Sequence, residues 1–263
     1  MNAGLVLVIA LLAGAIPFSA IVAWATKRVD LRDYGTGTVS GTGLFKVAGA
    51  GPLVVAGILD VGKGALGPAL AGHSRPELAA LAGGMALVGH NWSPFLRGAG
   101  GRGFAPSLGA LCVLGWPGAV LLLVALIIGT IVRRTGLMVF LAMLGLTPLL
   151  GGLYGIHGVW TGLALAVPMY AKRLAGNRPP EHRDARTYAR RLLFDHDGPQ
   201  DDGSTVAGTA PQPSAPAPPV PPDGHDATVR PCAGDPVVRG YRAASAPVDP
   251  PRPGGGHAGQ GNG

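Results

Sequence analysis

The amino-acid sequence predicts an all-α integral membrane protein with about seven transmembrane helices, its N-terminus outside and its C-terminus in the cytoplasm. Three observations lead to this fold class. Apolar runs recur along residues 1–176, and charged residues make up only 13% of the chain, compared with roughly 25% in soluble globular proteins. The basic residues of this region cluster at the ends of the apolar runs, which is typical of cytoplasmic membrane loops.

The first apolar run extends over about Leu5–Ala25. It matches the ~20 residues that cross a bilayer as a helix, and it is longer than the core of a secretory signal peptide. No basic residue precedes it, and its positive charges, Lys27 and Arg28, follow it. We therefore expect a retained transmembrane helix.

Six further apolar runs follow, and two of them are short enough to be tilted, re-entrant or partly buried. The six runs are Val47–Ala71, Leu78–Leu96, Phe104–Leu114, Gly118–Val132, Leu137–Leu150 and Leu153–Tyr170.

The loops between these runs alternate in charge. If alternate gaps are assigned to the inside, only Arg75 and two nearly neutral stretches remain outside. The positive-inside rule then predicts an odd number of spans and a cytoplasmic C-terminus. The inside gaps contain Lys27, Arg28, Arg32 and Lys46; Arg97 and Arg102; Arg133 and Arg134; and Lys172, Arg173 and Arg178.

The composition changes near Gly176, which divides the chain into a transmembrane domain, residues 1–176, and a cytoplasmic tail, residues 177–263. The tail is rich in Pro, Gly and Ala, and we expect it to be mostly disordered because it has few apolar residues. Its segment 184–194 forms either a basic amphipathic helix on anionic lipid or a transient helix. The net charge of +7 reflects the membrane loops, so no nucleic-acid partner is expected.

Two charged residues, Asp60 and Lys63, lie inside the second apolar run. Charges within a span are costly and usually indicate a function. At a spacing of three residues they share one helix face and can pair. A purely structural ion pair is the alternative.

The first inside loop contains the stretch GTGTVSGTG at residues 35–43, with Lys46 just beyond it. Glycines let successive backbone N–H groups converge on an anion, phosphate above all. The stretch has neither the βαβ context of a dinucleotide fingerprint nor the Lys-Ser/Thr ending of a P-loop. The candidate phosphate-binding residues are Gly35, Thr36, Gly37, Thr38 and Thr42. A flexible Gly/Thr linker is the alternative.

The second glycine-rich loop, GHNWSPFLRGAGGRG at residues 89–103, is predicted to lie on the same membrane side. Two such loops with Lys and Arg would form one pocket for a phosphorylated substrate at the bilayer surface. The candidate residues here are His90, Gly100, Gly101, Arg102 and Gly103. His90 could instead be a packing residue that caps the third span.

The order GAIPFSAIVAW, GTGTVSGTGLFK, LDVGKGALGP and GHNWSPFLRGAGGRGFAPSLG resembles the PlsY-type glycerol-3-phosphate acyltransferases. The resemblance extends over about Gly14–Gly109, and more weakly to Gly176. It implies a seven-span, multi-pass protein of the bacterial inner membrane that acts in phospholipid biosynthesis. Such a transferase moves the acyl group of an acyl phosphate to glycerol 3-phosphate, without a metal or cofactor. Its partners would be these substrates and membrane lipids, and the protein would be a monomer.

The resemblance implies catalytic roles for Lys46, Arg102 and His90, and substrate-binding roles for Asp60, Lys63 and the loop residues named above. Lys46 stands where the family pattern has Arg, and Arg102 where it has Lys. The His and Asn that usually end the seventh span have no counterpart, and Arg133, Arg134, Thr135, Tyr170 or Lys172 could replace them. A non-catalytic membrane scaffold or lipid/phosphate-binding relative is therefore the alternative function, with a transporter third.

Overall fold

The computed structural model describes residues 1–34, 38–180 and 183–195. All of them lie in one structural unit, Met1–Ala207. Their only regular secondary structure is helical, which confirms the all-α fold class for these residues. The helices are α1 (Ala3–Ala15), α2 (Phe18–Lys27), η1 (Leu31–Asp33), α3 (Gly41–Ala48), α4 (Ala50–Ala71), α5 (Pro76–Asn91), η2 (Pro94–Leu96), α6 (Phe104–Leu114), α7 (Trp116–Ile131), α8 (Thr135–Tyr154), α9 (Ile156–Ala175) and α10 (Ala185–Phe194).

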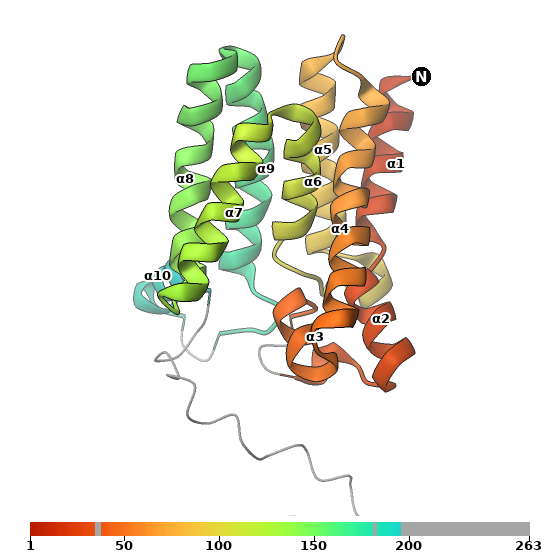
Figure 1. Ribbon diagram of the computed structural model, residues 1–263, viewed down its shortest axis with the longest axis vertical. Coiled ribbons are helices and arrows are strands. Elements are labelled where there is room, and N and C mark those ends of the chain that lie inside the picture. Colours follow the sequence, from red (N-terminus) through yellow and green to blue (C-terminus); the bar gives the residue numbers. More distant parts are fainter. Residues whose placement is uncertain (35–37, 181–182, 196–263) are drawn as a thin grey trace, which may run out of the picture. The chain divides into compact units, whose positions relative to one another are not determined.

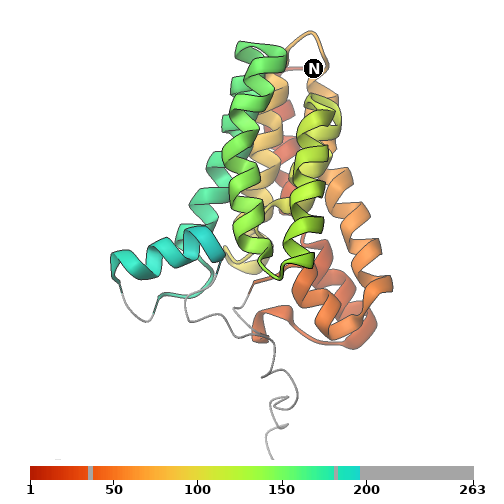
Figure 2. The same cartoon turned by 60° about the vertical axis from the view of Figure 1, so that its left-hand side comes forward.

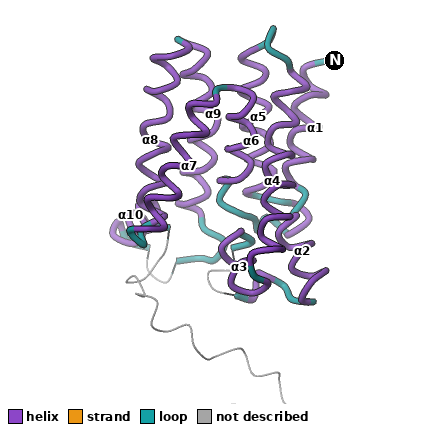
Figure 3. The backbone as a smooth tube through the Cα atoms, viewed as in Figure 1, coloured by secondary structure: helices purple, strands orange, loops and turns teal. Residues whose placement is uncertain are grey.

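The helices α1, α4, α5, α6, α7, α8 and α9 lie side by side as a bundle (Figure 1). Each contains most or part of one of the predicted apolar runs. The short helices α2, α3 and α10 lie at one end of this bundle, and the N-terminus lies at the other (Figure 2). Figure 3 shows that the loop between α5 and α6 also lies toward the end that carries α2, α3 and α10. The loops predicted to share one membrane side therefore gather at one end of the bundle.

The first apolar run is helical from Ala3 to Lys27, but it is broken at Ile16 and Pro17. Pro17 has no backbone N–H, and a residue that precedes a proline is disfavoured in the helical region. Ile16 accordingly adopts an extended conformation. The expected single helix over Leu5–Ala25 is thus two helices, α1 and α2.

The second apolar run begins later than the hydrophobicity pattern indicates. We predicted it from Val47, but α4 begins at Ala50 because Gly49, with a φ of 84°, separates it from α3. A positive φ of this size favours glycine. The third run, predicted to reach Leu96, ends its α-helix at Asn91, and a separate 3-10 turn, η2, follows.

Glycines bring the helix backbones into direct contact, above all between α4 and α6. A Cβ at Gly64 would overlap the carbonyl oxygen of Pro106, and a Cβ at Gly109 would overlap that of Val61. Small residues that allow close backbone approach are common where helices associate in membranes. Gly64 on α4 and Gly109 on α6 therefore fix the crossing of the two helices from both sides.

The side chains of α4 are distributed as expected for a helix in lipid. Asp60 and Lys63 are 4% and 5% exposed, while Ile58 is 66% exposed. A water-soluble helix would show the opposite arrangement. Within the described residues, three stretches are long and apolar enough to cross a membrane: Ala3–Lys27, Ala50–Ala71 and Thr135–Tyr154.

We predict that Gly64→Ala lowers the thermal stability of the protein in detergent, because the new methyl group must push the α6 backbone away. The expected loss in free energy of unfolding is about 1–3 kcal/mol. The matched control is Gly62→Ala, two residues earlier on the same helix, where a Cβ has nothing within 4 Å. If the two variants have equal melting temperatures, the close contact between α4 and α6 does not constrain the fold.

Candidate functional site

The ion pair between Asp60 and Lys63 lies where α4 passes the break between α1 and α2. Lys63 Nζ is 2.7 Å from Asp60 Oδ1, and it donates a hydrogen bond of 2.6 Å to the carbonyl oxygen of Ile16. Asp60 Oδ2 accepts a hydrogen bond of 3.4 Å from Ser19 Oγ in the first turn of α2. The predicted pairing is present, and it links α4 to both sides of the helix break.

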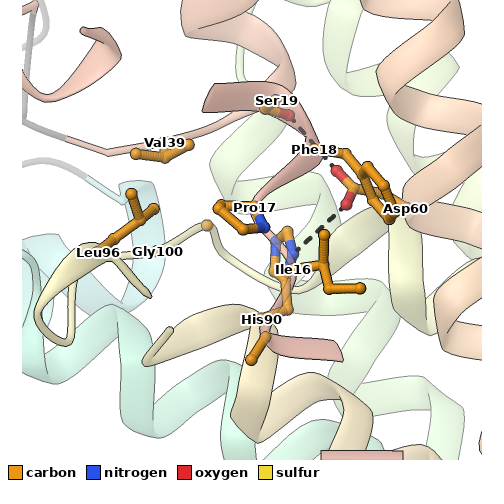
Figure 4. A pocket seen from close by; sticks show the side chains of 11 residues that line it. Ile16, Pro17, Phe18, Ser19, Val39, Asp60, His90, Leu96 and Gly100 are labelled. Carbon is orange, nitrogen blue, oxygen red and sulfur yellow. Dashed lines mark hydrogen bonds and ion pairs between the residues drawn. The ribbon is translucent and has the colours of Figure 1, made fainter. Parts of the chain in front are cut away.

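A small pocket opens beside this pair, between the two glycine-rich loops (Figure 4). The helix break forms one wall, and Asp60 and His90 contribute polar atoms. Val39 comes from the first loop, while Leu96, Gly100 and Gly101 come from the second. The remaining lining residues are Ala15, Ile16, Pro17, Phe18 and Ser19. The two predicted loops therefore meet at one pocket.

His90, in the last turn of α5, is a lining residue of this pocket. Its Nδ1 atom is 3.9 Å from Asp60 Oδ1, and its side chain is 11% exposed. The ring also packs against the second loop, because a Cβ at Gly101 would overlap His90 Nε2. His90 thus packs against the second loop and also lines the pocket.

Steric and conformational constraints explain why glycine occupies positions in the second loop. A Cβ at Gly100 would overlap the carbonyl oxygen of His90, and Gly103 has a φ of +80°. The N–H groups of Gly98 and Gly101 donate to the carbonyl oxygens of Ser93 and His90. An anion at this loop would therefore have to be bound by its other N–H groups and side chains.

Arg102 does not line the pocket. Its guanidinium donates a hydrogen bond of 3.1 Å to the carbonyl oxygen of Lys172, and its Nε lies 3.1 Å from Asp195 Oδ1. Arg102 therefore connects the second loop to the end of α9 and to the residue that follows α10.

The helix α10 is held in place by buried arginines. Arg173 donates to the carbonyl oxygens of Gly136 and Leu192, each at 2.9 Å, and Arg191 is only 4% exposed. The segment 184–194 thus forms a helix that packs against α8 and α9, whereas the sequence left open a lipid-bound or a transient helix.

The first loop is described incompletely. Gly35, Thr36 and Gly37 lie outside the described residues, while Thr38 is 8% exposed. Thr42 and Lys46 lie on α3 with exposed side chains. The structure thus does not bring Lys46, Arg102 and His90 into one cluster, and only His90 lines the pocket.

The chain before the first loop is fixed by a local ion pair. Asp30 caps η1 and forms an ion pair with Arg32, with 2.5 Å between Oδ2 and Nη2. The hydrogen bond from the Arg32 side chain lowers the pKa of the Asp30 carboxyl group. The carboxylate therefore stays ionised at neutral pH and can keep this turn in place.

Lys172, one of the proposed replacements for the missing His and Asn, lies at the second loop. Its side chain is fully buried, with Nζ 3.4 Å from the carbonyl oxygen of Gly98 and 5.3 Å from the ring centroid of Trp92. Tyr170, by contrast, donates to the carbonyl oxygen of Phe140.

The other proposed replacements are exposed. Arg133, Arg134 and Thr135 lie at the junction of α7 and α8. Asn177 contacts Thr38 and Gly100 of the two loops, and sequence reasoning missed it because it lies beyond the family motifs. Within the described residues, no group of three His, Cys, Asp or Glu side chains could bind a metal ion.

The fold and the site together define a helical protein with apolar outward surfaces and two glycine-rich loops at one end. The family profile for glycerol-3-phosphate acyltransferase matches residues 4–175. The chain therefore belongs to the glycerol-3-phosphate acyltransferase family, which confirms the resemblance seen in the sequence.

Individual relatives support this assignment. The chain is 37% identical over 137 residues to a glycerol-3-phosphate acyltransferase of Halalkalibacterium halodurans, covering 50% of this chain and 66% of the relative. It is 35% identical over 173 residues to glycerol-3-phosphate acyltransferase 4 of Dehalococcoides mccartyi, covering 62% and 74%. The chain spans 66% of the length of the Halalkalibacterium halodurans protein. It spans 52% of the length of a glycerol-3-phosphate acyltransferase of Shouchella clausii.

A solved structure shares the fold. This is a crystal structure of PlsY, an integral membrane glycerol 3-phosphate acyltransferase, in its glycerol 3-phosphate form. The TM-score is 0.62 at 23% identity, and the similarity covers 74% of this chain and 94% of that one. The similarity establishes the architecture of the bundle.

We predict that Asp60→Asn and Lys63→Met each destabilise the protein more than the double variant does. Each single change leaves a buried charge without its partner, at a cost of about 3–5 kcal/mol, while the double change removes both charges. Thermal unfolding in detergent measures the effect. If the two single substitutions have small effects on thermal stability, and these effects add in the double variant, the ion pair has no role in holding the helix break.

Proposed function

We propose that the protein transfers an acyl group from an acyl phosphate to glycerol 3-phosphate, or to a related phosphorylated acceptor, at the bacterial inner membrane. The observation that carries this proposal is the meeting of two glycine-rich loops at one pocket, beside His90 and Asp60. The family to which the chain belongs agrees with it.

The chemistry needs little from the protein beyond binding and orientation. An acyl phosphate is already activated, so the acceptor hydroxyl oxygen can attack the carbonyl carbon directly. The bond from that carbon to the phosphate oxygen breaks, and the departing phosphate takes the hydroxyl proton. The products are the acyl ester of the acceptor and inorganic phosphate. The protein's contribution is to hold both reactants close and to stabilise the developing charge.

The residues of the two loops would do this work. Arg102 belongs to the second loop and Lys46 lies just beyond the first, and neither lines the pocket. In the proposal they supply positive charge for the phosphate groups from outside it, and His90 lies at the pocket for the reacting end of the substrate. The first loop would contribute Gly35, Thr36, Gly37, Thr38 and Thr42, and the second Gly100, Gly101 and Gly103. Asp60 and Lys63 would support the pocket from α4.

The same proposal includes the placement in the membrane. Seven spans, an outside N-terminus and a cytoplasmic C-terminus would put both loops at the cytoplasmic surface, where the acyl chain can enter among the helices. The protein would act as a monomer, with residues 1–176 as its transmembrane domain and residues 177–263 as its cytoplasmic tail. The gathering of the basic loops at one end of the bundle supports this placement (Figure 1).

The topology predicts the outcome of reporter fusions at three positions. Fusions at Arg102 and Asn177 should report a cytoplasmic location, and a fusion at Arg75 the opposite side, because basic loops remain inside. A reporter that distinguishes the two compartments by its activity is sufficient. An outside location for Arg102 would contradict both the topology and a shared cytoplasmic site.

The activity predicts phosphate release that depends on an acceptor. Purified protein in detergent or lipid, supplied with acyl phosphate, should release inorganic phosphate when glycerol 3-phosphate is added. Arg102→Ala should reduce this rate by about 100-fold, because Arg102 joins the second loop to the end of α9 and a small misplacement of the bound reactants is costly. Lys46→Ala should reduce it by at least about tenfold, because a hydrogen bond to a charged group contributes roughly 1.5–3 kcal/mol.

The matched control is Lys27→Ala, which removes an exposed cation at the same end of the bundle and should leave the rate unchanged. If acyl phosphate neither binds nor reacts with any phosphorylated acceptor, the protein is a non-catalytic scaffold or a lipid/phosphate-binding relative.

A further inference from the structure

Asn177, which follows α9, contacts one residue of each glycine-rich loop. The side-chain amide nitrogen of Asn177 donates a hydrogen bond of 2.9 Å to the carbonyl oxygen of Gly100 in the second loop. The same nitrogen donates one of 3.3 Å to the hydroxyl oxygen of Thr38 in the first loop. One carboxamide therefore connects two loops that lie far apart in the sequence.

The turn that delivers Asn177 is well defined. Gly176 ends α9 with a φ of 64°, which favours glycine, and its N–H donates to the carbonyl oxygen of Lys172. Buried Arg191 donates to the carbonyl oxygen of Ala175 at 3.3 Å and to that of Arg178 at 3.0 Å. The backbone is thus held immediately before and after Asn177.

A second contact fixes this turn to the chain that leads into the first loop. The guanidinium of Arg178 donates a hydrogen bond of 3.1 Å to the carbonyl oxygen of Arg32. Arg32 belongs to η1, whose turn is fixed by its ion pair with Asp30. The position of Asn177 is therefore set relative to α9, to α10 and to η1.

Asn177 lies beyond the segment of the chain that matches the family, which ends at residue 175. Its two contacts involve the loops that the proposed function needs at a fixed spacing, with the pocket between them. A phosphate group held by two loops is bound well only if the loops keep that spacing, because hydrogen bonds weaken steeply when their length and angle change.

We propose that Asn177 is a positioning residue for the acyl transfer: it joins the two glycine-rich loops and so sets the geometry of the phosphate site. The inference rests on the proposed function, which supplies the substrate. Asn177 acts through Thr38 and Gly100, so its removal weakens binding of the phosphorylated substrates and leaves the chemical step largely intact.

The test compares Asn177→Ala and Asn177→Asp in the full chain. Alanine removes both hydrogen bonds, and aspartate keeps the size of the side chain but has no N–H to donate. We expect the KM for acyl phosphate to rise by about tenfold in both variants, which corresponds to about 1.4 kcal/mol, with kcat changed by less than about twofold.

The matched control is Arg186→Ala, an exposed residue of α10, which should keep the wild-type KM. A residue with a merely structural role would lower the melting temperature and the folded fraction while the constants per folded molecule stayed the same. A KM within about twofold of wild type in both Asn177 variants would overturn the proposal.

A double-mutant cycle separates this proposal from the proposed function. Thr38→Val removes the hydroxyl that Asn177 contacts. The decrease in melting temperature of the double variant Thr38→Val/Asn177→Ala should therefore be smaller than the sum of the two single decreases. If wild-type protein shows no turnover but the cycle is non-additive, the proposed function fails and the connection between the loops stands. If the losses add fully, the connection is absent and the proposal is overturned.

Discussion

The buried ion pair between Asp60 and Lys63 is the contact on which the arrangement of the site depends. A charge in apolar surroundings must be paired and hydrogen-bonded, and here the partners come from the break between α1 and α2. Lys63 binds the carbonyl oxygen of Ile16, and Asp60 binds Ser19 and faces His90. The second loop starts at the end of α5, beside His90, and the first loop follows α2 and η1. The pair therefore contacts the helices that lead to both loops.

Close helix packing provides the rigid frame for this pair. Gly64 lies four residues after Asp60, and its contact with Pro106 brings α6 against the same region of α4. Because α6 begins directly after the second loop, this contact also fixes where that loop ends. Packing and chemistry are thus coupled on α4, where polar residues stabilise the helix break and small residues determine the helix crossing.

The sequence predicted most of the fold but less of the site. Apolar runs and basic loops depend on composition within short stretches, so the approximate positions of the bundle helices could be anticipated. The exceptions are the break at Pro17, the start of α4 at Ala50 and the end of α5 at Asn91. His90 was a site candidate from the sequence, and the structure places it in the lining of the pocket. The contact between Arg102 and Asp195 could not be anticipated, because α10 follows the family motifs and its packing depends on α8 and α9.

The sequence by itself determined the helical class, the one-sided distribution of basic loops and the family, because each depends on local composition and on the spacing of motifs. Only the tertiary structure decided which residues meet. Asn177 lies 139 residues from Thr38 and 77 from Gly100, and no periodicity relates such positions. Their contact arises because the packing of α9 against α5 and α8, together with the turn at Gly176, returns the chain to the loops.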